Sequence, residues 1–343
     1  MLKTIRVEEA VGLDLAHDIT EIRPGEFKGP AFKKGHTVCE EDVCRLQKLG
    51  KNRLYVLDLA EDEIHENEAA ALLAEALSGP GVAWKNEPRE GKIGLFAAWD
   101  GLLKIETAAL AAFNLVDEVM CATLHGNTLV KKGELVAATR AIPLVMKRAS
   151  IERAAAIARQ NGAVVSVRPL RPAQAGLIVT GSEVYHGLVE DRFAPLLTAK
   201  IEALGSRVAA LDFVPDDEQA VGRTILAHLT RGCDLVLLTG GLSVDPDDVT
   251  RHGVRLAGAS EIHYGSAALP GAMLLVAYIG LVPLVGVPAC GLHHKVTALD
   301  LILPRLLTGE RIGRRDLAFL GHGGLCRECP DCRFPVCSFG KTW

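Results

Sequence analysis

The sequence from residue 174 to 310 alternates short apolar runs with longer amphipathic stretches. The runs at 233–238 and 282–289 carry few polar residues, which is typical of strands that are buried on both faces. Between such runs, residues 191–204 and 217–231 predict helices, and the second begins with acids, as the helix dipole favours. This order predicts an α/β fold of three layers, in which helices cover both faces of a mostly parallel sheet.

The longest apolar stretch, residues 267–287, is interrupted repeatedly by helix-breaking residues. These are Pro270, Gly271, Gly280, Pro283 and Gly286. A membrane-spanning helix needs about 20 consecutive apolar residues, so this stretch predicts two strands joined by a turn.

The pattern divides the chain into four parts. Residues 1–79 predict an N-terminal α+β region, and residues 80–172 a β-rich domain, because runs with β-branched residues alternate there with turns. Residues 173–310 form the α/β domain described above. Residues 311–343 form a cysteine-rich tail.

Within the first two parts we expect a few individual elements. A short helix is predicted at 7–20, and another helix ends at Gly50. A strand follows at 53–59. An acidic, alanine-rich helix follows at 61–77, and one further helix is expected near 150–161.

Composition and charge narrow the functional classes. The 343 residues carry a net charge of −4, so no basic field indicates binding to nucleic acid or to an anionic membrane. The first residues lack the apolar core of a signal peptide. We therefore expect a cytoplasmic protein, in which the scattered cysteines are buried thiols and not a disulfide framework.

Four loops with polar or glycine-rich sequences follow the predicted strands of the α/β domain. They are TGSE (180–183), VPDD (214–217), TGGLSVDPDD (239–248) and VPACG (287–291). In open parallel sheets, ligands bind beyond the carboxyl ends of the strands. We therefore expect the four loops to meet at one crevice.

The third of these loops has the most informative chemistry. Paired glycines let backbone N–H groups approach a phosphate or a pterin closely. Asp245, Asp247 and Asp248 could hold Mg²⁺, which prefers oxygen ligands. The simpler alternative is a strand-to-helix turn with solvated acids.

The α/β domain resembles the molybdopterin-binding domain of molybdenum-cofactor biosynthesis proteins. The matching segments are VTGSEV, VPDDEQAV, LLTGGLSVDPDDVT, LPGAM (269–273) and GVPAC. The first 170 residues are similar, more loosely, to the larger molybdenumtransferase-type members. The resemblance implies that molybdopterin, or its adenylylated form with an AMP moiety from ATP, binds in the strand-end crevice with Mg²⁺.

The resemblance also implies the site residues. By motif, the two critical aspartates are Asp216 and Asp248, which would manage the phosphate charge through a divalent ion. A helix N-cap is the alternative role for Asp216. The predicted pterin-binding residues are Thr180, Gly181, Ser182, Glu183, Thr239, Gly240, Gly241, Ser243, Asp245 and Pro288.

Some positions depart from the family pattern. Leu242 stands where a small hydroxylated residue is more usual, and Asp245-Pro246 replaces glycine or basic residues. The N-terminal half lacks the DGYA-type segment of molybdenumtransferases. Its basic segment 27–36 is either an anion-binding patch or a solvated loop.

The tail contains Cys326, Cys329, Cys332 and Cys337, in a C-x2-C-x2-C-x4-C pattern. Four thiolates at this spacing predict a metal site, either an iron–sulfur cluster or zinc. The alternatives are thiols that hold sulfur or molybdenum, or free cysteines in a disordered tail. The preceding glycine-rich segment 321–324 is expected to be a flexible hinge.

Three functions remain open from the sequence. The leading one is Mg²⁺-dependent adenylylation of molybdopterin or insertion of molybdate, as a transferase. The others are a non-catalytic molybdopterin carrier or sensor, and a nucleotide pyrophosphatase of the competence-associated type. The resemblance further implies a homodimer, with molybdopterin, molybdate and possible molybdoenzymes or other cofactor-pathway proteins as partners.

Overall fold

The computed structural model describes residues 3–23, 26–56, 59–84, 87–160, 162–243 and 249–341. By its internal contacts the chain forms two compact units. The first comprises residues up to 98 together with 105–124 and 132–167; the second comprises 99–104, 125–131 and everything from 168 onward. The four-part division of the sequence is finer than this and stays a prediction.

The first unit begins with small antiparallel pairs around a local core. Strand β1 (Lys3–Arg6) pairs with β4 (Arg53–Val56), and β2 (Ile19–Arg23) pairs with β3 (Phe27–Phe32). Helix α1 (Glu40–Lys48) lies between β3 and β4 in the chain and contributes Leu46 to the same core. The helix expected at 7–20 is only the short 3-10 helix at Val7–Ala10.

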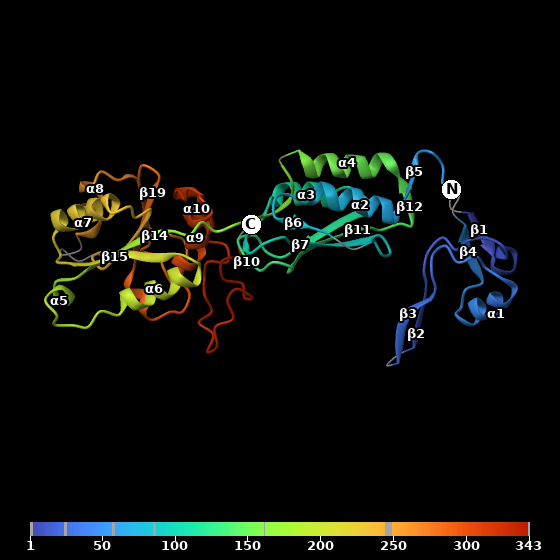
Figure 1. Cartoon of the computed structure of the whole chain (residues 1–343), viewed down its shortest axis with the longest axis horizontal. Coiled ribbons are helices and arrows are strands. Elements are labelled where there is room, and N and C mark those ends of the chain that lie inside the picture. Colours follow the sequence, from blue (N-terminus) through green and yellow to red (C-terminus); the bar gives the residue numbers. More distant parts are fainter. Residues whose placement is uncertain are drawn as a thin grey trace. The chain divides into compact units, whose positions relative to one another are not determined.

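The remainder of the first unit contains a four-stranded sheet with helices on one side (Figure 1). Its four-stranded sheet has the order β6-β7-β11-β9, with β5 and β12 as a separate pair. The strands are β5 (Glu63–His65), β6 (Val82–Ala83), β7 (Lys92–Ala97), β9 (Val119–Thr123), β11 (Leu135–Ala141) and β12 (Val145–Lys147). The helices are α2 (Glu66–Leu77), α3 (Thr107–Asn114) and α4 (Arg148–Arg159).

The helix predicted at 61–77 therefore begins later than expected. Glu63–His65 pairs as a strand with Val145–Lys147, and the helix begins only at Glu66. His65 is the N-cap, because its ring nitrogen accepts a hydrogen bond from the backbone N–H of Asn67. Pairing with a strand 80 residues away in the sequence overrides the local helical preference.

A six-stranded sheet lies at the centre of the second unit, in the order β15-β14-β16-β19-β18-β17. Its strands are β14 (Gln174–Thr180), β15 (Arg207–Val214), β16 (Leu235–Thr239), β17 (Ser260–Tyr264), β18 (Leu275–Ile279) and β19 (Val282–Val287). The first four strands of this order pair in parallel, whereas β18 pairs antiparallel with both of its neighbours, β19 and β17. The sheet is thus mixed, with the predicted parallel pairing in its first four strands and antiparallel pairing at β18. The reason is local, because the tight turn between β18 and β19 permits only an antiparallel pair.

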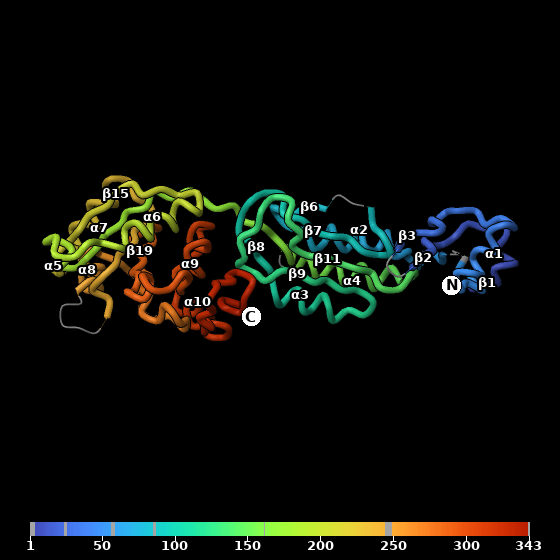
Figure 2. The backbone as a smooth tube through the Cα atoms, turned by 90° about the horizontal axis from the view of Figure 1, so that it is seen from below, coloured from blue at the N-terminus to red at the C-terminus, as the bar shows by residue number. Residues whose placement is uncertain are grey.

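Helices cover both faces of this sheet, as predicted (Figures 1 and 2). Helices α6 (Phe193–Ala203) and α9 (Ala298–Leu307) pack with Leu177 of β14 on one face. Helices α7 (Glu218–Thr230) and α8 (Thr250–Leu256) pack with the next residue, Ile178, on the other. Successive strand residues point to opposite faces, so both are buried.

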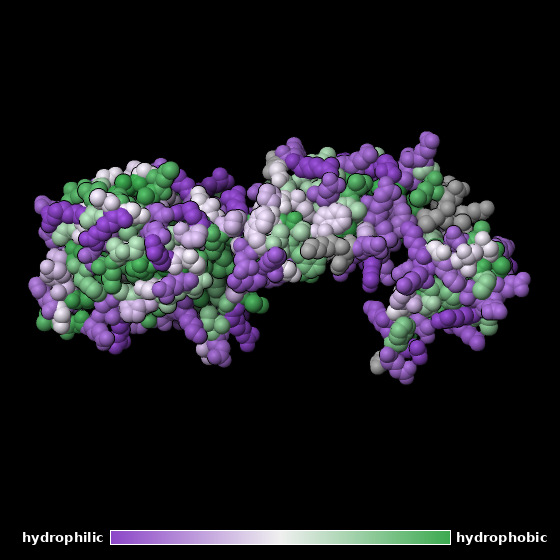
Figure 3. Space-filling model, viewed as in Figure 1, coloured by the Kyte–Doolittle hydropathy of each residue, from purple (hydrophilic) through white to green (hydrophobic). Residues whose placement is uncertain are grey.

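Shorter elements complete the described structure. They are β8 (Gly101–Ile105), β10 (Leu129–Val130), β13 (Val165–Arg168), α5 (Ser182–Tyr185), the 3-10 helix Ala289–Leu292 and α10 (Arg314–Phe319). The edge strand β15 leaves Leu211 and Phe213 exposed. Figure 3 shows apolar surface between polar residues on the second unit. Among the described helices, none has the length and hydrophobicity that crossing a membrane requires.

Candidate functional site

The parallel strands of the second unit end at one edge of the sheet. Thr180 at the end of β14 lies opposite Val214 of β15, and Thr239 of β16 lies opposite Val287 of β19. The four predicted loops therefore leave the sheet from the same edge, as the sequence predicts. Three of these loops follow strands whose side chains are largely buried, whereas the loop at 214–217 follows the partly exposed edge strand β15.

Two buried threonine hydroxyls fix the start of the glycine loop. Thr180 Oγ1 donates to the carbonyl of Thr239 at 2.9 Å, and Thr250 Oγ1 donates to the carbonyl of Gly240 at 2.9 Å. The two hydroxyl oxygens are 3.2 Å apart. A hydroxyl has one proton to donate, so each threonine holds one of two successive carbonyls. Thr180 and Thr250 therefore stabilise the conformation of the backbone where the glycine loop begins.

Gly240 and Gly241 are required by this packing. Both have positive φ angles, +80° and +55°. A Cβ atom at Gly240 would lie 2.2 Å from the carbonyl oxygen of Thr180, and one at Gly241 would lie 2.6 Å from Thr250 Oγ1. The sequence analysis explained these glycines by the close approach of a ligand. In the structure they also let the loop pack closely against Thr180 and Thr250.

Leu242, the departure from the family pattern, is an anchor for the same loop. Its side chain is buried in the core between the sheet and helices α7 and α8. Its carbonyl accepts a hydrogen bond of 2.5 Å from the Tyr264 hydroxyl. The apolar side chain secures the loop to the core, while the exposed Ser243 follows it.

Asp216 links two of the strand-end loops. Its Oδ2 accepts a hydrogen bond of 2.7 Å from the backbone N–H of Ser182, and Ser182 Oγ accepts one of 3.3 Å from the N–H of Asp216. The N-cap of α7 is Asp217, whose Oδ1 accepts from Ala220 N at 2.6 Å. The N-cap alternative for Asp216 is therefore wrong by one residue.

The acidic part of the glycine loop cannot be placed in this way. Asp245, Asp247 and Asp248 lie outside the described residues. The pairing of Asp216 with Asp248, and the Mg²⁺ site that depends on it, stay predictions.

A pocket of about 590 Å³ lies beyond the strand ends. Its wall includes the glycine loop, the segments 269–273 and 287–290, His294 and the tail residues Leu325, Cys326 and Glu328. Of the predicted binding residues, Gly240, Gly241, Ser243 and Pro288 line this pocket together. The others that are described, which are Thr180, Gly181, Ser182, Glu183 and Thr239, are not among its lining residues.

The sequence analysis missed one wall of this pocket. The segment 269–273 is the LPGAM motif, which indicated the family but was not assigned to the site. Gly271 has φ +118°, and a Cβ atom there would lie 2.5 Å from the Cβ of Ala298. The glycine thus lets the segment pack against the start of α9. Its presence in the motif is the feature of the sequence that could have indicated this wall.

Residues 176–308 match the family described as "Probable molybdopterin binding domain". The chain carries a domain of this family. Residues 4–58 match a separate domain of unknown function.

Curated relatives are similar over short stretches. The CinA-like protein of Thermotoga maritima is 36% identical over 81 residues, which are 24% of this chain and 20% of that protein. The CinA-like protein of Syntrophus aciditrophicus is 33% identical over 94 residues, 27% of this chain and 22% of that protein. The chain thus spans about a fifth of the length of these curated relatives.

Two solved structures are similar to part of the chain. The protein CinA from Thermoplasma acidophilum has 17% identity and a TM-score of 0.36, over 39% of this chain and 98% of that chain. The molybdopterin biosynthesis enzyme MoaB from Thermus thermophilus has 21% identity and a TM-score of 0.35, over 40% and 98%.

The tail is attached to the molybdopterin-binding domain by backbone pairing. Leu269 N–H donates to the carbonyl of Gly324 at 2.7 Å, and Cys326 N–H donates to the carbonyl of Leu269 at 2.8 Å. A Cβ atom at Gly324 would lie 2.3 Å from the carbonyl oxygens of Ala267 and Leu320. The hinge predicted at 321–324 is therefore wrong, because Gly324 fits the chain tightly against the domain.

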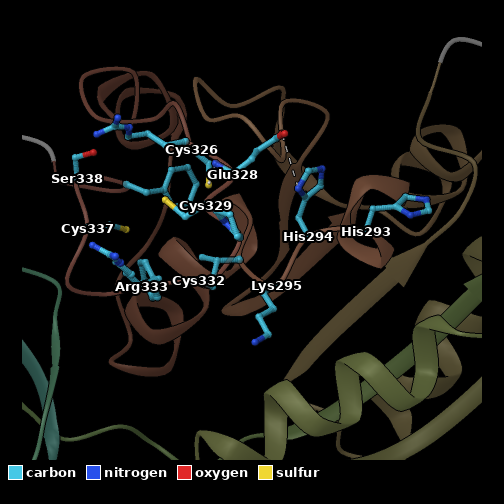
Figure 4. A pocket seen from close by; sticks show the side chains of 15 residues that line it. His293, His294, Lys295, Cys326, Glu328, Cys329, Cys332, Arg333, Cys337 and Ser338 are labelled. Atoms are coloured by element: carbon cyan, nitrogen blue, oxygen red, sulfur yellow. Dashed lines mark hydrogen bonds and ion pairs between the residues drawn. The ribbon is translucent and has the colours of Figure 1, made fainter.

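A second pocket, of about 370 Å³, lies beside the first (Figure 4). All four tail cysteines line it, together with His293, His294, Lys295, Arg327 and Arg333 among others. His294, Cys326 and Glu328 line both pockets. His294 Nδ1 is 4.0 Å from Glu328 Oε1, as the dashed line in Figure 4 marks.

Helix α9 does not begin directly after the GVPACG segment. His293 and His294 follow the 3-10 helix, and α9 begins at Ala298 with Thr297 as its N-cap. His294 is therefore in a loop between the two pockets. Nearby, burial raises the pKa of the Cys290 thiol above its usual value, so that this pocket-lining group stays protonated at neutral pH.

Proposed function

We propose that the second unit binds molybdopterin or its adenylylated form in the strand-end pocket and acts in molybdenum-cofactor biosynthesis. The supporting observation is the assembly of three family motifs around that pocket. The glycine loop, the LPGAM segment and Pro288 come from separate parts of the chain and line the same pocket. Its volume of about 590 Å³ is within the usual range for sites of small organic ligands.

The chemistry of the wall suits a pterin with a terminal phosphate. Apolar atoms of Leu269, Met273 and Val287 offer a surface for a planar ring. Among the described lining residues there is no Lys or Arg. Phosphate charge in this pocket would therefore be balanced by backbone N–H groups and by a divalent cation, for which Mg²⁺ with carboxylate ligands is the usual choice.

We assign this chemistry to Asp216 by the family motif, although Asp216 itself is not among the residues that line the pocket. Capping of α7 is performed by its neighbour Asp217, so the fold does not need Asp216 as a cap. Its Oδ2 is held by Ser182 N–H, which fixes the carboxylate at the sheet edge. With Mg²⁺ bound, such a carboxylate would position the ion against phosphate oxygens during adenylylation or molybdate insertion.

Binding is tested with a variant that fills the pocket. Met273 lines the pocket and is 38% exposed, so Met273→Trp adds bulk there at little cost to folding. Leu281→Trp is the matched control, because Leu281 is 91% exposed and outside that pocket. We expect Met273→Trp to weaken molybdopterin binding by about 10-fold or more, which is about 1.4 kcal/mol, and the control to leave it unchanged. Equal molybdopterin affinities of the two variants would show that molybdopterin does not bind in this pocket.

Turnover is tested with molybdopterin, MgATP and molybdate in one reaction. Formation of adenylylated molybdopterin or of the molybdenum-loaded cofactor supports a transferase, whereas bound but unchanged pterin supports a carrier. Asp216→Asn is compared with Asp217→Asn, in which asparagine still caps the helix. We expect only the first to lose most activity, and full activity of Asp216→Asn would contradict its role.

A second candidate comes from the curated relatives. The similarity of this chain to CinA-like proteins favours the alternative function, which is hydrolysis of a nucleotide pyrophosphate bond. Release of AMP from a dinucleotide without any pterin present would select this function over the first.

A further inference from the structure

The last part of the chain forms a loop that is fixed at both ends. At its start, Cys326 N–H donates to Leu269, and at its end, Gly340 N–H donates to the carbonyl of Gly323 at 2.9 Å. Phe339 is buried in the core of the second unit, with its ring centroid 6.4 Å from that of Phe334. Between these attachments the described residues form no helix or strand.

This loop has little apolar packing of its own. Val336 is 90% exposed, and Cys329 and Cys332 are exposed as well. Cys326 and Cys337 are half-buried against the core. Short segments that cannot bury enough apolar surface commonly depend on a disulfide or a metal for their conformation.

Four of the nine cysteines of the chain lie in this loop and line one pocket (Figure 4). All are free thiols. The spacing places two pairs of thiols within reach of a single point, as in sites that bind zinc or iron–sulfur clusters. Among the described residues, no three His, Cys, Asp or Glu side chains are already gathered in the arrangement of a metal site.

We propose that Cys326, Cys329, Cys332 and Cys337 bind one thiophilic metal centre, held by thiolates. Cys326 and Cys337 are fixed by the core, and the exposed Cys329 and Cys332 move inward to complete the set. For a divalent ion, four thiols release four protons to solvent and form a complex with a net charge of −2. The site is independent of the proposed pterin chemistry.

The charges around the pocket suit such an anionic complex. Lys295, Arg327 and Arg333 line the pocket. These cations offset the net charge of a metal–thiolate centre, as expected for a site that must keep its ligands deprotonated.

The proposed metal centre lies next to the ligand pocket, because the two pockets share lining residues. Cys326 lines both pockets, and its N–H pairs with Leu269, which is itself part of the ligand-pocket wall. A metal bound to Cys326 would therefore stabilise this wall. His294, which also lines both pockets, lies between the two sites.

The experiment uses the full chain, reduced, freed of metal with a chelator and kept under anaerobic conditions without pterin. Titration with Co²⁺ is followed by the absorption of thiolate-to-cobalt charge transfer. We expect saturation at about one equivalent and displacement by Zn²⁺, as for a tetrahedral thiolate site. Iron and acid-labile sulfide in the protein as purified would instead identify the centre as an iron–sulfur cluster, which equally supports the proposal.

The variants separate these thiols from the others. The double variant Cys329→Ser/Cys332→Ser is expected to lose the charge-transfer bands and the stoichiometric metal. Cys39→Ser/Cys44→Ser removes two other exposed thiols of the chain and is expected to bind as the wild type does. Thermal unfolding checks that both variants fold. The proposal is overturned by a fully reduced wild type that takes up no metal, by equal binding in both variants, or by a stable disulfide among the tail cysteines. A failed pterin-binding assay with normal metal uptake would overturn only the proposed function.

Discussion

Thr250 offers the most direct test of how the glycine loop is held. Its side chain is fully buried and donates a hydrogen bond of 2.9 Å to the Gly240 carbonyl. Thr250→Val keeps the shape of the side chain and removes the donor. The carbonyl then loses its partner in a buried place, which costs about 1–3 kcal/mol. Thr250→Ser keeps the donor and removes one buried methyl group, at about 1 kcal/mol.

The measurement is urea unfolding followed by circular dichroism. A loss of about 2 kcal/mol with a slope of about 2 kcal/mol per molar urea shifts the midpoint by about 1 M. We expect Thr250→Val to shift the transition of the second unit more than Thr250→Ser does, and to weaken ligand binding more. If serine proves as costly as valine, the hydroxyl does not position the loop.

Three further outcomes follow from other parts of the second unit. Gly324→Ala places a methyl group about 2.3 Å from two backbone oxygens, so we expect the tail to detach and to become sensitive to trypsin. Gly313→Ala, whose methyl group would meet its nearest atoms only at 3.8 and 3.9 Å, should not have this effect. Burial would raise the pKa of Glu310, but hydrogen bonds from Lys104 and Arg305 outweigh it and lower that pKa; its stabilising contribution is therefore present above about pH 4.3 and is lost as the pH falls toward the lowered value. The free energy of unfolding of Glu310→Gln should depend less on pH in the acidic range than that of the wild type. An unchanged pH dependence would show that this carboxylate makes no such contribution. Because burial raises its pKa, Cys290 should react with iodoacetamide at pH 8 more slowly than the exposed tail thiols, and bound ligand should slow it further; mass spectrometry of the labelled peptides measures both rates.

Local sequence patterns were sufficient for much of the second unit. The fully apolar runs predicted strands buried on both faces, and the amphipathic stretches between them predicted helices on two sides. Helix α6 was expected at 191–204 and forms at Phe193–Ala203. These predictions succeed because burial on both faces leaves a strong signature in a few consecutive residues.

Other predictions failed where distant residues decide the outcome. The strand Glu63–His65 depends on its pairing with Val145–Lys147. The glycines at 321–324 were expected to give freedom, but Gly324 is in close contact with two carbonyl groups from other turns. A glycine has the same appearance in a sequence whether it serves flexibility or close packing.

The sequence by itself determined the chemistry of this protein: which loops follow the strands, which of them carry glycines and acids, and how four cysteines are spaced in the tail. Only the tertiary structure decided which of these groups meet. It turned the hydroxyls of Thr180 and Thr250 toward the loop's own carbonyls, and it placed Cys326 on the wall of both pockets. The physical reason is that residue type fixes what a side chain can bond to, whereas the pairing of β-strands and the packing of helices fix which partner comes within reach.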